Sequence, residues 1–121
     1  DTDMVLLPGG LGGVHSILAS ETAMNFIRLA YEKNCLIAAI CAAPTILASL
    51  HITDGRRATC YPGLEDQMDA AKMIPCGAVQ DGNVITGRAA GSADEFGLAC
   101  LRALKGEDTA RQVASDIVYR A

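Results

Sequence analysis

The stretch Leu36-Ile37-Ala38-Ala39-Ile40-Cys41-Ala42-Ala43-Pro44-Thr45 decides the fold of this chain. Its first five residues are all apolar, which is typical of a short strand buried on both faces of a sheet. Helix-compatible residues follow at once, with Pro44 in the first turn, where proline is favoured. The pattern therefore predicts a strand, a sharp turn and a helix, with Cys41 at the joint. Unpaired N–H groups and the positive end of a helix favour a thiolate there, so we predict that Cys41 is a nucleophile.

An earlier apolar run, residues 4–7, predicts a second strand that ends at Pro8-Gly9-Gly10. A helix is expected from about Ser20 to Lys33, with one apolar face formed by Ala23, Phe26, Ile27, Ala30 and Tyr31. A helical crossover joins parallel strands, so the two strands are expected to pair in parallel through a right-handed connection.

The carboxyl ends of parallel strands share one edge of a sheet, and reactive crevices form there. Gly9-Gly10 and Cys41 both follow such ends, so we expect them to face one another. Backbone N–H groups of the glycines and of Ala42 would then form an oxyanion hole for an intermediate on the Cys41 sulfur. The alternative is that Pro8-Gly9-Gly10 only makes a turn.

The second half of the chain predicts shorter elements. We expect a short strand within 57–61, a loop with a possible helical turn over 64–75, and a β-hairpin over 78–86 around Asp81-Gly82. Ser92 and Glu95 have the spacing of a capping box for a helix that ends at Gly106. A last helix is expected from about residue 108, carrying Val113, Ala114, Ile117 and Val118. The fold class is therefore α/β, with a mostly parallel sheet plus a hairpin.

Length and composition predict one domain over residues 1–121. Half of the residues are hydrophobic and 20% are charged, which is enough apolar material for a core. The net charge of −4 comes from 10 basic and 14 acidic residues, and the basic ones are scattered, so no nucleic-acid partner is expected. No apolar stretch approaches the roughly 20 residues of a membrane helix, and Asp1-Thr2-Asp3 lacks the basic start of a signal peptide. We expect no membrane partner and a cytoplasmic location.

The cysteine pattern agrees with a reducing compartment. Five cysteines, an odd number without a C-x-x-C pair, do not form a complete set of internal disulfides. His15 and His51 are not at ligand spacing from any cysteine, so we predict neither a metal site nor a cofactor. We interpret Cys35 and Cys100 as small buried hydrophobic residues.

Four blocks of sequence, in this order, resemble those of the ThiJ/PfpI family: residues 5–10, 36–45, 58–62 and 81–92. That family includes the parkinsonism-associated deglycase and belongs to the class I glutamine amidotransferase-like superfamily. The resemblance implies a flavodoxin-like three-layer sandwich, a homodimer, and Cys41 as a reactive, oxidisable cysteine at a nucleophile elbow. It also implies that Gly10 and Ala42 supply the oxyanion amides.

The sequence departs from the family pattern in three places. Tyr61 stands where one branch has a histidine; it stays a catalytic candidate as a hydrogen-bond donor, but a phenol, with an ordinary pKa of roughly 10, is a poor base at neutral pH. Ala42 stands where the protease branch has a histidine, which weakens a peptidase or amidase interpretation. Family members also begin with a further strand, helix and strand that carry a Glu beside the cysteine. This segment is absent from the sequence, so we expect the chain to be a fragment covering the C-terminal two-thirds of the domain.

Other side chains remain candidates with open roles. His15 lies in the predicted glycine-rich loop and is either a partner of Cys41 or a solvated side chain. His51, at the far end of the Cys41 helix, is interpreted as structural, and Glu95 as the cap of its own helix. Arg88 faces an anionic substrate group or pairs with an acid on the surface, and the surface pairing is favoured.

Three functions follow from this interpretation. The first is an enzyme whose Cys41 thiolate acts on small reactive carbonyl compounds, as a glyoxalase- or deglycase-like hydrolase or lyase. The alternative is a non-enzymatic oxidative-stress sensor or chaperone-like protein with an oxidisable Cys41. The third is a catalytically silent chain that acts only through its fold or dimer interface.

Overall fold

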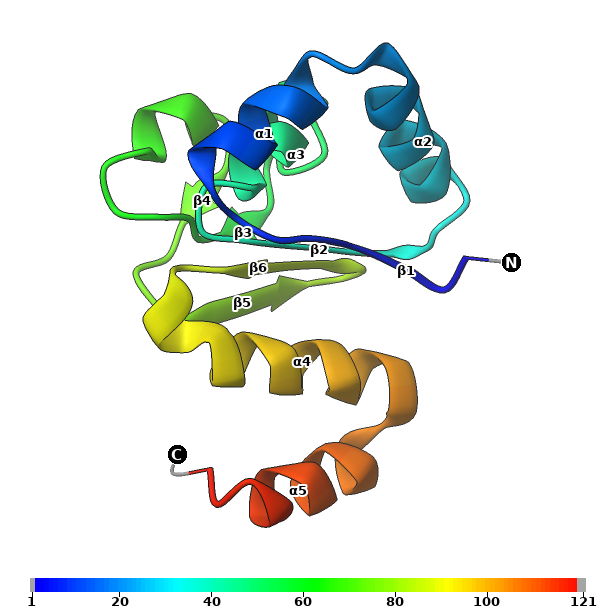
Figure 1. The fold of residues 1–121 in the computed structure, drawn as a ribbon, viewed down its shortest axis with the longest axis vertical. Coiled ribbons are helices and arrows are strands. Elements are labelled where there is room, and N and C mark those ends of the chain that lie inside the picture. Colours follow the sequence, from blue (N-terminus) through cyan, green and yellow to red (C-terminus); the bar gives the residue numbers. More distant parts are fainter. Residues whose placement is uncertain (1, 120–121) are drawn as a thin grey trace.

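The computed structural model describes residues 2–119 and contains a four-stranded sheet of order β1-β2-β6-β5 (Figure 1). Strands β1 (Met4–Leu7), β2 (Leu36–Ile40) and β6 (Val84–Gly87) run parallel, and β5 (Ala78–Asp81) pairs antiparallel with β6. The predicted parallel pairing of the first two strands and the predicted hairpin are both confirmed. In the hairpin turn, Gly82 has a φ of 63°, a conformation that glycine adopts without strain.

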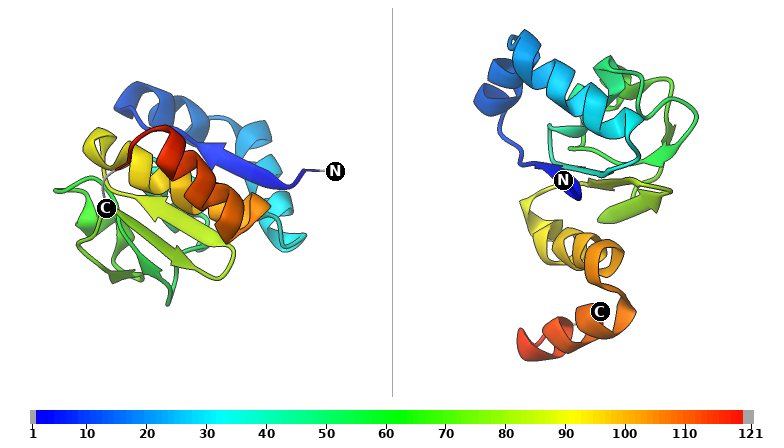
Figure 2. Two further views of the ribbon diagram at one scale, coloured as in Figure 1. Left: turned by 90° about the horizontal axis from the view of Figure 1, so that it is seen from below. Right: turned by 90° about the vertical axis from the view of Figure 1, so that its right-hand side faces the viewer.

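Helices cover both faces of this sheet, as a three-layer sandwich requires (Figures 1 and 2). One face is covered by α1 (Leu11–Leu18), α2 (Glu21–Glu32) and α3 (Pro44–Ser49). The other is covered by α4 (Ala93–Lys105), and α5 (Glu107–Asp116) packs on the outer side of α4. None of the helices formed by residues 2–119 is long and apolar enough to cross a membrane.

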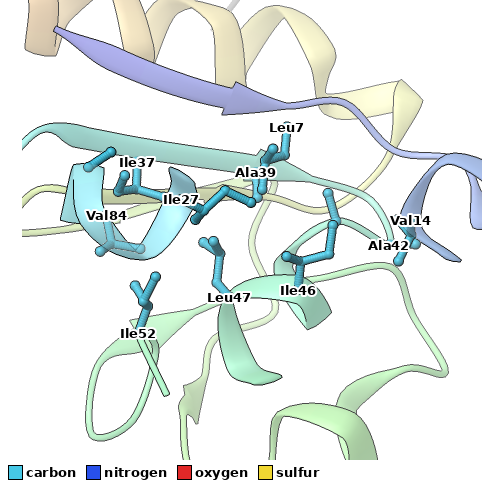
Figure 3. Close-up of a cluster of buried hydrophobic side chains, with 12 residues drawn as sticks. Leu7, Val14, Ile27, Ile37, Ala39, Ala42, Ile46, Leu47, Ile52 and Val84 are labelled. Carbon is cyan, nitrogen blue, oxygen red and sulfur yellow. The ribbon is translucent and has the colours of Figure 1, made fainter. Parts of the chain in front are cut away.

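Successive side chains of β2 point to opposite faces of the sheet, so β2 contributes to a buried cluster on each face. Ile37 and Ala39 point into the cluster beneath the first three helices, where Ile46 and Leu47 of α3 meet them (Figure 3). Ala38 points the other way, against Phe96 and its neighbours in α4. Because β2 is central and buried on both faces, its position fixes where Cys41 emerges. The edge strand β1 is less buried, since Leu6 is 48% exposed.

A second, two-stranded parallel sheet is formed by β3 (Arg57–Ala58) and β4 (Lys72–Met73). The strand predicted over 57–61 is therefore only two residues long and lies outside the main sheet. The predicted helical turn within 64–75 is the 3₁₀ helix η1 (Glu65–Met68), whereas β4 was not predicted. Met68 anchors this region because it packs against Ala58 and Cys60 in a third buried cluster.

Two predictions about the first helical region are wrong. The segment after Gly10 is the helix α1 and not a loop: glycines disfavour helix, but Val14 is buried in the core and its amide donates to the Gly10 carbonyl at 2.9 Å. In α2, Phe26 is 54% exposed, so it does not belong to the buried face formed by Ile27 and Ala30.

The capping box is also wrong. A second 3₁₀ helix, η2 (Ala90–Ser92), leads into α4, and the Ser92 side chain makes no capping hydrogen bond. The Glu95 carboxylate lies against Gly77 instead, where a Cβ would be 2.2 Å from its Oε1. The predicted stop at Gly106 is confirmed. The last helix begins at Glu107, and Ile117 and Val118 lie beyond its end, exposed to solvent.

Candidate functional site

Cys41 occupies a strained turn between β2 and α3. Its φ is +68°, in the left-handed region that costs a non-glycine residue about 1–3 kcal/mol. Two backbone hydrogen bonds hold it there: the Cys41 amide donates to the Gly87 carbonyl at 3.0 Å, and its carbonyl accepts from the Tyr61 amide at 2.8 Å. The predicted sharp turn is confirmed, and the neighbouring segments keep it in this conformation.

The loop after β1 lies directly against this turn. A Cβ on Gly9 would be 2.5 Å from the Cys41 Cβ and 3.3 Å from its Sγ. The first distance is far below van der Waals contact, so this approach requires glycine. The expectation that the glycine pair and Cys41 face one another is confirmed.

The backbone amides beside Cys41 that have no hydrogen-bond partner among residues 2–119 include those of Gly10 and Ala42, which border the same cavity as Cys41. Ala42 is buried, where N–H groups are nearly always paired, whereas Gly10 is exposed to solvent. Free N–H groups beside one sulfur are suited to binding an anion. The oxyanion role itself stays a prediction.

The cavity beside Cys41 has a volume of about 340 Å³ and a mostly apolar wall. Leu11, Leu64 and Pro62 supply much of this wall, and Tyr61 adds a half-exposed phenol. No imidazole or carboxylate from the described part of the chain lines it. The groups that these residues bring together are thus one thiol, two amides and one phenol.

The two histidines lie elsewhere. His15 is exposed on α1 and is not part of the cavity wall, so the structure does not bring it to Cys41. His51 follows α3 in a left-handed conformation, and its Nδ1 lies 3.1 Å from Asp54 Oδ2 on the surface. This agrees with the structural interpretation of His51, although its side chain pairs with Asp54 and not with the helix carbonyls.

Two other thiols are held in the neutral form. The pKa of Cys60 is raised to about 11, first by burial and then by the nearby carboxylates of Glu65 and Asp66 and by the Cys41 side chain. Burial alone raises the pKa of Cys100 to about 11, which agrees with its interpretation as a buried hydrophobic residue. Cys35 is only half-buried, and its Sγ donates to the Thr2 carbonyl at 3.1 Å.

Arg88 does not form the expected surface ion pair. It is half-buried, and no carboxylate among residues 2–119 lies within salt-bridge distance of its side chain. It borders a second cavity of about 360 Å³, which also includes Cys60, Pro62 and Glu65. In the described part of the chain, no group of three or more His, Cys, Asp or Glu side chains is placed to hold a metal ion.

Sequence reasoning missed the wall formed by residues 62–64, since no local pattern marks it. A tertiary hydrogen bond from the Tyr61 amide to the Cys41 carbonyl and the packing of Leu64 against the core bring these residues to Cys41. The contact of Gly9 with Cys41 was indicated by the sequence, because a glycine pair after a buried strand lets the backbone approach a neighbouring segment closely.

The chain is similar to known proteins both in sequence and in structure. The family model described as DJ-1/PfpI family matches residues 1–103. Protein DJ-1alpha of Drosophila melanogaster is 38% identical over 98% of this chain, which spans 56% of that protein. The crystal structure of Drosophila melanogaster DJ-1beta has a TM-score of 0.92 and 36% identity, with coverage of 98% of this chain and 65% of the other. The structure named Toxoplasma gondii DJ-1, oxidized, has a TM-score of 0.89 and 26% identity, with the same coverage of both chains.

Proposed function

Because the chain belongs to the DJ-1/PfpI family, we propose that Cys41 acts as a nucleophile on small reactive carbonyl compounds, in a glyoxalase- or deglycase-like reaction. One observation carries the proposal. The Cys41 thiol, held at a left-handed elbow, shares its cavity with the unpartnered N–H groups of Gly10 and Ala42. The chain spans less than two-thirds of the relatives it matches, so the activity of the whole protein is part of the proposal.

The proposed step is addition of the Cys41 thiolate to an aldehyde carbon. A sulfur–carbon bond forms, and the π electron pair of the carbonyl moves to its oxygen. The resulting oxyanion accepts hydrogen bonds from the two free amides, an arrangement that is worth about 3 kcal/mol per donor in other enzymes. The proposal assigns the donation of a proton to this oxygen to Tyr61, which borders the cavity.

The cavity also limits which substrate fits. Its volume of about 340 Å³ and its mostly apolar wall suit compounds of a few carbon atoms. A peptidase is a poorer fit because Ala42 provides no imidazole directly after the cysteine.

A turnover assay with methylglyoxal tests this proposal. The wild-type chain should consume methylglyoxal and form lactate, whereas Cys41→Ala should lose the activity and Cys35→Ala should keep it. Cys35 is a suitable control since its thiol lies at the opposite end of β2. Equal rates in wild type and Cys41→Ala would remove the enzyme proposal.

A second candidate function is sensing of oxidants through Cys41. The same two amides would stabilise a sulfinate on its sulfur, and the related Toxoplasma gondii protein is described as oxidised. Mass spectrometry after mild peroxide treatment tests this. The sensor proposal requires Cys41 to oxidise before the other four thiols, and it fails if oxidation is not selective.

We also propose, on the family relationship, that the protein forms a homodimer in a reducing compartment such as the cytoplasm. Five free cysteines are consistent with that compartment. Analytical ultracentrifugation of the purified protein tests the oligomeric state, and a concentration-independent monomer would contradict the dimer.

A further inference from the structure

We propose that Arg88 binds a carboxylate of the substrate, so that the preferred compounds are small aldehydes bearing an anionic group. This inference rests on the proposed function, because it names the substrate class for the same cysteine. Three observations support it: Arg88 lies near Cys41, its side chain has no hydrogen-bond or ion-pair partner among residues 2–119, and it borders a cavity.

The backbone places Arg88 beside Cys41. Gly87, the last residue of β6, accepts the hydrogen bond from the Cys41 amide at 3.0 Å. Arg88 is the next residue, so standard backbone dimensions keep the Cα atoms of residues 41 and 88 within about 8 Å. The Arg88 amide donates to the Gly77 carbonyl at 2.9 Å, which fixes the root of its side chain. Both residues thus lie at the carboxyl edge of the parallel strands, where ligands bind in open α/β sheets.

The Arg88 side chain differs from the other described arginines in having no partner. Each of the others makes a hydrogen bond or an ion pair within residues 2–119: Arg28, Arg56, Arg57, Arg102 and Arg111. Arg88 is half-buried as a residue, but its guanidinium nitrogens are not among the fully buried, unpaired side-chain atoms of residues 2–119, so this group is open to a ligand. Its planar fork matches a carboxylate in a bidentate arrangement, which makes a carboxylate the expected ligand.

The cavity in front of Arg88 adjoins the Cys41 cavity. The two, of about 360 and 340 Å³, share Pro62 as a wall residue. Cys60 borders the Arg88 cavity, and the next residue, Tyr61, borders the Cys41 cavity. The proposed ligand would have its aldehyde at Cys41 and its carboxylate, a few carbons away, on the Arg88 side of the shared Pro62 wall.

Glu65 is the one described carboxylate in the wall of this second cavity. Its Oε1 accepts from the Gly63 amide at 2.8 Å, so its position is fixed by the loop. Its negative charge opposes an incoming carboxylate, whereas the Arg88 charge attracts it. Replacing Arg88 with a neutral residue should therefore weaken anion binding, and replacing Glu65 with a neutral residue should strengthen it.

Alkylation of Cys41 by iodoacetate and iodoacetamide tests the charge preference without needing turnover. The two reagents differ in charge, and peptide mass spectrometry gives their rates at Cys41 and at the remote Cys35. The iodoacetate-to-iodoacetamide rate ratio at Cys41 should fall about three- to tenfold in Arg88→Gln and rise in Glu65→Gln. Arg88→Lys should retain part of the preference, and the ratio at Cys35 should not change. A ratio at Cys41 that is equal in wild type and Arg88→Gln would overturn the proposal.

Turnover of 4,5-dioxopentanoate and of its neutral methyl ester then tests the substrate class. We expect wild type to favour the anion and Arg88→Gln to lose this preference through a higher KM for the acid. Equal use of acid and ester by wild type would reject the carboxylate site while leaving the proposed function intact. No turnover of any compound would reject the proposed function, and the alkylation ratio would still decide the role of Arg88.

Discussion

Gly9 lies against Cys41 so closely that a Cβ on Gly9 would be 2.5 Å from the Cys41 Cβ. The two residues are 32 positions apart in sequence but follow the carboxyl ends of neighbouring parallel strands. This contact places the amide of the next residue, Gly10, in the cavity that contains the thiol. The geometry of the site therefore depends on the absence of a side chain at position 9.

Replacing Gly9 with alanine should disrupt the site. The added methyl group must displace either the loop or the Cys41 turn, so alkylation of Cys41 by iodoacetamide should slow and the protein should lose about 1–3 kcal/mol of unfolding free energy. Peptide mass spectrometry and urea denaturation measure the two effects.

Gly12→Ala provides the matched control. A Cβ at Gly12 meets nothing within 4 Å, and the residue is exposed in α1. This variant should keep the Cys41 alkylation rate and gain about 0.5–1 kcal/mol, because alanine favours helix over glycine. Equal alkylation rates in the Gly9 and Gly12 variants would show that the close approach is not required.

Cys41→Gly should be more stable than Cys41→Ala. Both variants lack the thiol, but only alanine must keep a side chain at a φ of +68°. The difference should be about 1 kcal/mol in favour of glycine, read from urea midpoints. A more stable alanine variant would mean that the turn relaxes and is not held by the Gly87 and Tyr61 hydrogen bonds.

The same substitution should have opposite effects at two buried threonines. Thr53 Oγ1 is buried and has no hydrogen-bond partner among residues 2–119, so Thr53→Val should be neutral or stabilising by up to about 1 kcal/mol. Thr86 Oγ1 accepts from the Thr59 amide at 2.9 Å, so Thr86→Val leaves that amide unpaired and should cost about 1–3 kcal/mol. Thermal unfolding of both variants checks the signs.

Alkaline pH should destabilise the fold through its buried thiols. The pKa values of Cys60 and Cys100 are raised in the folded state to about 11, from an ordinary value of 9.0. A raised thiol pKa means that the unfolded state ionises first, so this stability is present below pH 9 and is lost as the pH rises towards 11. The loss should reach up to about 2 kcal/mol per thiol. Urea midpoints between pH 8 and 11 measure it, and Cys100→Ala should reduce the slope relative to wild type.

Local patterns were sufficient where one element determines its own structure. The run from Leu36 to Ile40 is apolar throughout and forms a central strand, and Pro44 begins the helix that was predicted there. The Asp81-Gly82 turn closes the expected hairpin. Prediction was wrong where tertiary packing overrides propensity: α1 forms despite two glycines because Val14 is buried, and Glu95 packs against Gly77 instead of capping its helix.

By itself, the sequence determined the α/β class, the strand–turn–helix at Cys41 and the identity of the thiol at the joint, since these depend on residues adjacent in the chain. Only the tertiary structure decided what surrounds that thiol. It brought Gly9 into contact with Cys41, excluded His15 from the cavity, and placed Arg88 near it with no side-chain partner in the described part of the chain. The physical reason is that strand pairing and core packing bring together residues far apart in the chain, and no local periodicity records which side chains then meet.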